Sequence, residues 1–253
     1  GLAWRCSPRS FYQGLAEFDP PEVASAPLPR LYLQAKQLAS DLSTPGELKE
    51  AWQPATAMSV LGGLVDPPDL ATVEATRREL AESGALTAAE EEAAMTSLGK
   101  ACLTLPFDLS LCRLIWLGVH WGYAADAVVL ACSLAVQDPF SSPSAFATPS
   151  PLELGQKLRR SNASRRFFDS RNFSEPLAIR CLFLEFWRNF QSTADGRLGC
   201  RRAWLKHANK LAGTHAVIPK RLAELCAQVE EVARRLSEIC APGSLALEQL
   251  QEL

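Results

Sequence analysis

The 253-residue chain lacks the features that would place it in several common classes of protein. It holds 8 cysteines but no CxxC pair, so a zinc finger has no ligand pair to build on. Its 3 histidines show no HExxH spacing. No apolar run approaches the roughly 20 residues that cross a bilayer, and the N-terminal residues do not resemble a signal peptide. We therefore expect a soluble, intracellular chain, nuclear or cytoplasmic and not secreted, with free cysteine thiols.

Catalytic motifs are also absent. The only Gly-Lys pair, Gly99-Lys100, has Ala94 and Ala101 where a phosphate-binding loop needs glycine and Ser/Thr. The sequence contains no GxGxxG or GxSxG and no acidic cluster typical of a Mg²⁺ site. The carboxylates of Glu90 to Glu92 are expected to be solvated. We predict no catalytic residue, no metal site and no cofactor in this chain.

What the chain has is a globular composition, 47% apolar and 21% charged, with mostly helical spacing. Asp69 and Asp108 are placed to cap helices, and Gly84 to end one. Residues 85–98 favour a hairpin or wing, and 137–151 a Ser/Pro loop. The predicted helices are 31–42, 57–64, 70–82, 108–118, 124–136, 153–166, 176–190 and 222–239. The last has a narrow apolar seam, which fits packing against the chain's own helices or a coiled-coil contact with a partner.

Charge is unevenly distributed along the chain. Residues 1–140 hold 9 Lys/Arg against 17 Asp/Glu, and residues 141–253 hold 17 against 11. The excess concentrates in 157–221, where 15 basic side chains, 11 of them Arg, are interleaved with aromatics. Such a stripe fits a surface that follows a nucleic-acid backbone, or a solvated helical face whose Arg stems cover the core.

The order of several motifs resembles the region that follows the motor domains in DEAH/RHA-type ATP-dependent RNA helicases. The similar segments, in chain order, are Pro21-Glu22-Val23, Asp66-Pro67-Pro68, Gly84-Ala85-Leu86, Thr96 to Lys100, Leu105 to Asp108, and Ser133 to Phe140. The chain also departs from the family pattern, for example at Glu175-Pro176, where the family usually has Asp-His. The resemblance is therefore to a divergent member.

The resemblance implies a mainly α fold, in which a winged-helix domain is followed by a helical-bundle ratchet-like domain. It implies that residues 1–20 are a remnant of the second RecA-like motor domain with a linker, 21–100 the winged helix, and 101–253 the ratchet-like bundle. Because the chain begins with Gly1 and not with Met, we also expect it to be a piece of a longer polypeptide. The resemblance implies that an OB-fold could follow it in that polypeptide. ATP and Mg would belong to the motor of that parent protein, so residues 1–253 should not hydrolyse ATP alone.

In such a helicase this region would grip single-stranded RNA during 3′ to 5′ movement. The predicted RNA contacts lie in the basic segment: Arg159, Arg160, Arg165, Arg166, Lys220 and Arg221, with Phe167 or Phe168 as a stacking surface. The alternative function is a non-catalytic helical interaction module that kept the helicase-associated fold and binds a protein partner. The 222–239 seam and the 141–151 loop would then be its docking features.

Overall fold

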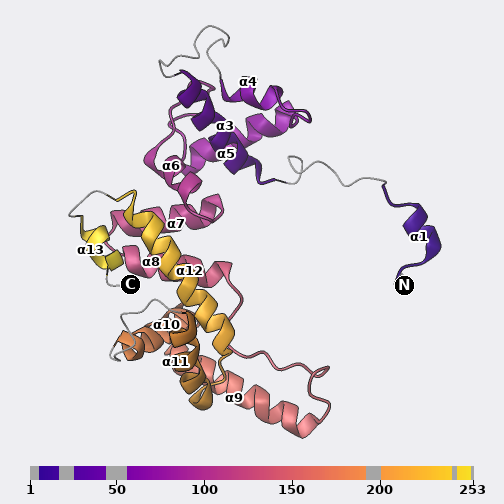
Figure 1. The fold of residues 1–253 in the computed structure, drawn as a ribbon, viewed down its shortest axis with the longest axis vertical. Helices are drawn as coiled ribbons and strands as arrows, with labels where there is room; N and C mark the ends of the chain where they lie inside the picture. Colours follow the sequence, from indigo (N-terminus) through magenta and orange to yellow (C-terminus); the bar gives the residue numbers. More distant parts are fainter. Residues whose placement is uncertain (1–5, 17–25, 44–55, 192–200, 241–243, 252–253) are drawn as a thin grey trace. The chain divides into compact units, whose positions relative to one another are not determined.

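A computed structural model describes residues 6–16, 26–43, 56–191, 201–240 and 244–251 (Figure 1). The chain divides into two compact units, Gly1–Met95 and Thr96–Leu253. In the described parts of both units the regular elements are helices, and β pairing is limited to two isolated bridges. The prediction of a mainly α fold is confirmed.

The first unit holds four described helices. They are α1 (Arg9–Gln13), α3 (Leu28–Ser43), α4 (Ala57–Gly62) and α5 (Leu70–Ser83). Helix α3 packs against α4 and α5, and its Tyr32 and Leu33 are fully buried with Val73 and Leu80 of α5. These apolar positions recur at helical spacing, so one face of each helix turns toward a shared core.

The polar segment after α5 is fastened to this core by one carboxylate. Glu91 accepts hydrogen bonds from the Tyr32 hydroxyl at 3.0 Å, the Met58 backbone N–H at 2.9 Å and the Arg77 guanidinium at 3.1 Å. Lys36 donates to the Glu91 carbonyl at 2.7 Å. The Glu91 side chain is only 18% exposed. The expectation that Glu90 to Glu92 are all solvated is therefore wrong for Glu91, which joins α3, α4 and α5.

The predicted hairpin at 85–98 is shorter than its sequence pattern indicates. A single antiparallel bridge pairs Leu86 with Met95, and between them Thr87 and Ala94 exchange two hydrogen bonds of 3.0 Å each. Turns fill the space between these residues, in keeping with the Ala/Glu composition, which does not favour strands.

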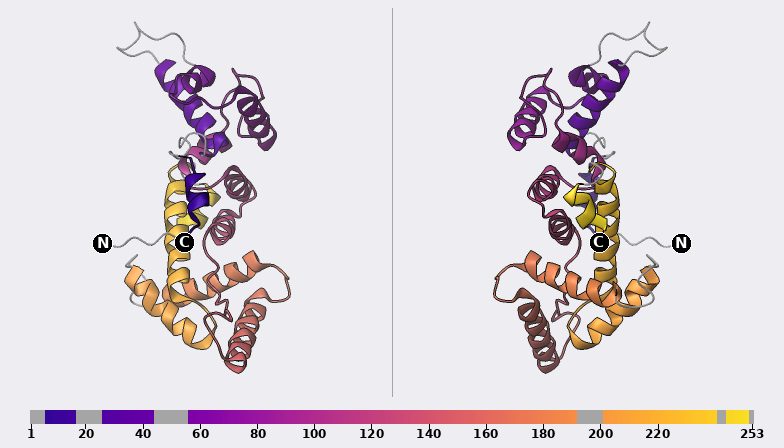
Figure 2. Two further views of the ribbon diagram at one scale, coloured as in Figure 1. Left: turned by 90° about the vertical axis from the view of Figure 1, so that its right-hand side faces the viewer. Right: turned by 90° about the vertical axis from the view of Figure 1, so that its left-hand side faces the viewer.

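The second unit is a bundle of eight described helices. They are α6 (Ser97–Thr104), α7 (Leu109–His120), α8 (Ala124–Ala135), α9 (Pro151–Asp169), α10 (Glu175–Gln191), α11 (Arg201–Thr214), α12 (Pro219–Ser237) and α13 (Leu245–Gln251). Helix α8 contacts α7, α10, α12 and α13, and α12 packs along α8 and α11 (Figure 2). These two helices therefore form the centre of the unit.

The antiparallel pair α7 and α8 requires a glycine at its closest approach. A Cβ atom added to Gly118 would lie 2.2 Å from the Cβ of Ala127 and 3.1 Å from the carbonyl oxygen of Tyr123. Any larger residue at 118 would push the two helices apart, so the absence of a side chain there allows the tight α7–α8 turn.

The apolar seam of α12 faces the interior of this unit. Leu222, Leu225, Val229, Val232 and Leu236 are each at most 1% exposed. Burying a side chain of this size contributes roughly 1.5–3 kcal/mol relative to leaving it in water. The seam therefore packs against the chain's own helices, and the interpretation as a coiled-coil contact with a partner is wrong.

Helix positions were predicted where caps and periodicity are strong. Asp69 caps α5 through the Thr72 N–H at 3.1 Å, Asp108 caps α7 through the Leu111 N–H at 2.9 Å, and Gly84 ends α5 with a φ of 86°. Four helices were not predicted: α1, α6, α11 and α13. Of the predicted motor remnant and linker, residues 1–5 and 17–20 lie outside the described residues, as does the Pro-Glu-Val segment at 21–23.

Over the described ranges, no helix is by itself both long and apolar enough to cross a membrane. Helices α6 and α7 would pass that test only together, and they are bent by 120° at the break between them.

Candidate nucleic-acid interface

Helix α9 carries the densest basic sequence in the chain. It begins with Ser150, whose hydroxyl accepts from the Glu153 N–H at 3.4 Å, and Pro151 occupies its first turn. Its buried residues are few and polar or aromatic: Ser161, Ser164 and Phe168. The helix therefore presents a broad exposed face.

That exposed face gathers three of the predicted contacts. Arg159 and Arg166 are seven residues apart, which is close to two helical turns, so both lie on the same side of α9. Phe167 follows directly and is 65% exposed. Guanidinium groups bind phosphates and an accessible aromatic ring stacks on bases, and here the ring lies about 100° round the helix from Arg166.

The Phe167 ring rests on a small aromatic cluster. Its centroid lies 5.1 Å from that of His215 and 5.0 Å from that of Phe168. Phe168 itself is 3% exposed and also contacts Phe140, at 5.9 Å between centroids. Of the two stacking candidates, only Phe167 is accessible, because Phe168 belongs to the core beneath it.

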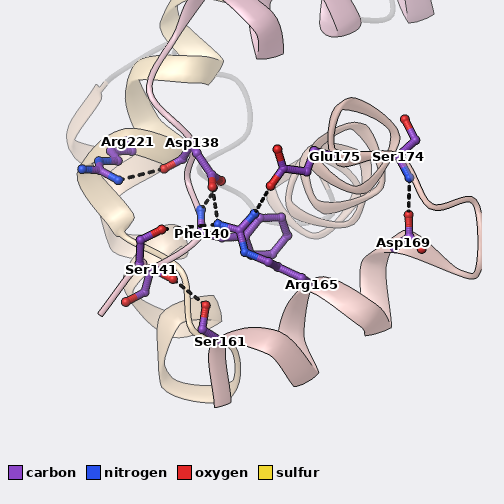
Figure 3. Close-up of polar contacts among 10 residues, drawn as sticks. Asp138, Phe140, Ser141, Ser161, Arg165, Asp169, Ser174, Glu175 and Arg221 are labelled. Carbon is purple, nitrogen blue, oxygen red and sulfur yellow. Dashed lines mark hydrogen bonds and ion pairs between the residues drawn. The ribbon is translucent and has the colours of Figure 1, made fainter. Parts of the chain in front are cut away.

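Arg165 points to the other side of α9, into a polar junction (Figure 3). Its guanidinium pairs with Asp138 and, at 2.9 Å, with Glu175 at the start of α10. The same group lies 5.1 Å from the centroid of the Phe140 ring. Its positive charge is therefore balanced within the chain, and Arg165 joins α9 to α10 and to the 138–140 segment.

The segment after α8 is the centre of this junction. The Asp138 carboxylate accepts from the Phe140 N–H at 2.8 Å, and Arg221 donates to the Asp138 carbonyl at 3.0 Å. Phe140 is fully buried and forms an antiparallel bridge with Val217, just before α12. Asp138-Pro139-Phe140, one of the motifs that carry the family resemblance, is therefore a structural link between α9 and α12.

Two serines orient α9 on this link. Ser161 donates to the Ser141 carbonyl at 2.5 Å (Figure 3). Ser164 accepts from the Ala216 N–H at 2.9 Å. Both hydroxyls are buried, so these bonds determine which side of α9 meets the bundle. They leave Arg159 and Arg166 facing outward.

The remaining candidates have mixed surroundings. Arg160 is exposed, but it donates to the carbonyls of Ala212 and Gly213 at 3.2 and 2.8 Å, near the end of α11. Lys220 is exposed in the first turn of α12, and Arg221 is half-buried. Arg159 and Arg166 therefore share one ridge of α9, Phe167 lies on the neighbouring side of the helix together with Arg160, and Arg165 and Arg221 make contacts inside the unit.

The turn from α9 to α10 contains three residues with positive φ: Ser170 at 49°, Arg171 at 70° and Phe173 at 53°. The Asp169 carboxylate accepts from the Phe173 and Ser174 N–H groups at 3.0 and 2.9 Å and so holds this strained turn. Sequence reasoning gave Asp169 no role. The signal that could have found it is an Asp seven residues before the predicted helix start at 176.

The described part of the chain contains no cluster of side chains suited to binding a metal ion. No group of three or more His, Cys, Asp or Glu side chains there could hold a metal ion. The free cysteines Cys102, Cys112, Cys132 and Cys226 are buried. Burial raises the pKa of the Cys132 thiol to about 12, so it stays protonated and unreactive.

No family model matches the chain, but several curated proteins do. It is 30% identical over 141 residues to the putative ATP-dependent RNA helicase ucp12 of Schizosaccharomyces pombe, which is 55% of this chain and 10% of that protein. It is 24% identical over 238 residues to DExH-box ATP-dependent RNA helicase DExH2 of Arabidopsis thaliana, which is 91% of this chain and 13% of that protein.

A third relative is the putative ATP-dependent RNA helicase DHX57 of Mus musculus, 32% identical over 123 residues, 49% of this chain and 8% of that protein. The chain is homologous to part of the DEAH/DExH-box ATP-dependent RNA helicases. It spans between 8% and 13% of the length of these three helicases, in keeping with a helicase-associated region.

Proposed function

We propose that this chain is the accessory RNA-channel region of an ATP-dependent 3′–5′ RNA helicase. It would grip single-stranded RNA while an upstream pair of RecA-like motor domains, using ATP and Mg, supplies the movement. In this proposal residues 21–100 form a winged-helix domain, and residues 101–253 a ratchet-like bundle that a possible OB-fold would follow. Its setting would be intracellular.

The observation that carries the proposal is the exposed ridge of α9. Arg159 and Arg166 are exposed and form no ion pair within the described residues, and the exposed Phe167 lies on the neighbouring side of the helix. By contrast, Arg165 is paired with two carboxylates. The ridge thus offers two uncompensated charges to one strand of RNA, and the neighbouring side of α9 offers an exposed ring.

The names of the homologues indicate which kind of nucleic acid to propose as the ligand. Their names identify them as RNA helicases, and the matched region includes most of this chain in the Arabidopsis relative. The alternative of a protein-binding module loses its main docking feature, because the 222–239 seam is buried inside the second unit.

The test is the salt dependence of RNA binding by the 253-residue chain. We would measure binding of a fluorescent single-stranded oligouridine at several salt concentrations, comparing the wild type with the double variant R159A/R166A. Each phosphate contact contributes about 0.7 to the slope of log K against log salt for a single strand. The double variant should therefore bind more weakly, with a slope smaller by up to about 1.4.

The matched control is K100A/R113A, which removes two positive charges from exposed positions of the same unit, outside the basic segment. Its slope should stay that of the wild type. If the ridge and control variants have equal slopes, the α9 ridge does not contact RNA.

A further inference from the structure

The loop between α8 and α9 is rich in serine, threonine and proline. Three of the five Ser/Thr-Pro pairs of the chain lie within it, at Ser142-Pro143, Thr148-Pro149 and Ser150-Pro151. After the bridge that Phe140 forms with Val217, the loop has one turn, in which the Ala147 and Thr148 N–H groups donate to the Ser144 carbonyl, and no other regular structure. A serine before proline in such a loop has the form that proline-directed protein kinases accept.

The three hydroxyl groups are not equally available. Thr148 is only 5% exposed, and its oxygen lies 3.4 Å from the Lys157 ammonium. The Ser150 oxygen is engaged as the cap of α9. Ser142 is exposed, and within the described residues its hydroxyl makes one long contact, 3.5 Å from an amino group of Arg165. A kinase could therefore reach Ser142 without unfolding a helix end or opening the core.

We propose that Ser142 is a phosphorylation site for a proline-directed kinase and that Arg165 receives its phosphate. The Ser142 hydroxyl oxygen attacks the γ-phosphorus of ATP bound to the kinase. A bond forms between that oxygen and phosphorus, the bond from phosphorus to the β–γ bridging oxygen breaks, and ADP leaves. The hydroxyl proton passes to the general base of the kinase.

The surroundings decide what the phosphate does after transfer. It adds a charge of about −1.5 to −2 and three acceptor oxygens next to the Arg165 guanidinium. Two carboxylates already face that guanidinium, Asp138 and Glu175. Glu175 is 77% exposed and can turn into solvent, whereas Asp138 also bonds the Phe140 N–H. The phosphate therefore takes the place of Glu175 on Arg165.

The charge change has a consequence for the α9 ridge, and this consequence rests on the proposed function. Arg165 precedes Arg166 in the helix, so the new negative charge lies within the electrostatic range of the ridge at moderate salt. Phosphorylation of Ser142 is expected to weaken binding of single-stranded RNA about three- to tenfold at 0.1 M salt.

The first experiment tests the modification by itself. The 253-residue chain is incubated with a purified proline-directed kinase and ATP, and phosphorylated residues are mapped by mass spectrometry. We expect phosphate on Ser142 in the wild type and no phosphate at position 142 in S142A. In P143A, which keeps the hydroxyl but removes the proline, we expect much less phosphorylation of Ser142. S144A, which alters a neighbouring serine not followed by proline, is the matched control and should be modified like the wild type. No phosphate on Ser142, or equal modification of Ser142 in the wild type and P143A, overturns the proposal.

The second experiment tests the effect on RNA. Oligouridine affinity is measured for the wild type and for S142A, each before and after kinase treatment. Weaker binding of the treated wild type, with treated S142A unchanged, supports the regulatory effect, and equal affinities of treated and untreated wild type overturn it. If the untreated chain binds no RNA, the proposed function fails, while phosphate on Ser142 in the first experiment still establishes the site.

Discussion

Each of the two units contains one polar junction that joins its own helices, and the two junctions have different surroundings. In the first unit, the Glu91 carboxylate meets a buried hydroxyl, a backbone N–H and a guanidinium, and its side chain is 18% exposed. In the second unit, Arg165 meets Asp138 and Glu175 with 23% of its side chain exposed, next to a helix face rich in arginine. The difference teaches that the Glu91 junction acts through stability, whereas the Arg165 junction also borders the surface proposed to bind RNA.

The largest effect is expected at the Glu91 junction. The change E91Q removes the charge that Tyr32, Arg77 and the Met58 N–H all face, and the buried partners are left with a weaker acceptor. We expect a loss of about 2–3 kcal/mol in the free energy of unfolding of the first unit. Urea unfolding followed by circular dichroism, with hydrogen exchange of α3 to locate the loss, measures it.

The control for this prediction is E90Q, which changes the exposed neighbour in the same way. It should alter the free energy of unfolding by less than about 0.5 kcal/mol. Equal destabilisation by E90Q and E91Q would mean that the contacts of Glu91 contribute no more to the free energy of unfolding than an exposed carboxylate does.

A comparison of adjacent arginines separates stability from RNA binding. The change R165Q breaks the ion pairs with Asp138 and Glu175 and is expected to cost about 1 kcal/mol of stability, since the pairs are partly solvated. The change R166Q removes an exposed charge and should leave stability unchanged while weakening oligouridine binding. Thermal melts and fluorescence anisotropy on both variants give the two readouts. The distinction between junction and ridge fails if R166Q lowers stability as much as R165Q does.

The smallest effect is the pH dependence of the Glu91 junction. Burial alone would raise the pKa of Glu91, but hydrogen bonds from the Met58 N–H, Tyr32 and Arg77 outweigh burial and lower it. A carboxyl group whose pKa is lower folded than unfolded contributes stability that is fully present above the unfolded pKa, about 4.3 for Glu. That contribution is lost as the pH falls below about 4.3 through the folded pKa.

Urea unfolding of the wild type and E91Q at pH 7, 5 and 3.5 tests this sign. The difference in free energy of unfolding between the two proteins should be the same at pH 7 and 5 and smaller at pH 3.5. A difference that stays constant over all three values would show that the Glu91 charge is not coupled to folding.

Local signals determined much of the fold. Asp69 and Asp108 cap the helices that follow them, and Gly84 ends α5, because a cap depends only on residues within one helical turn. The α12 seam is likewise visible in sequence, since its spacing alone marks one apolar face. Some helices were missed although their signals are present. In the basic α11, Trp204, Ala208 and Leu211 recur at helical spacing, but the segment was interpreted from its charge as a surface.

The candidate site was predictable as a segment but not residue by residue. The sequence by itself determined a helical chain, a basic second half and an order of motifs similar to RNA helicases. Only the tertiary structure decided that Phe168 is buried while Phe167 is exposed, that Arg165 is paired while Arg166 faces solvent, and that Glu91 lies in a junction while Glu90 is exposed. These pairs are adjacent in sequence and alike in type. The two pairs in α9 differ because neighbouring helical residues point about 100° apart. Glu90 and Glu91 lie in a turn, where only Glu91 meets partners from distant parts of the chain.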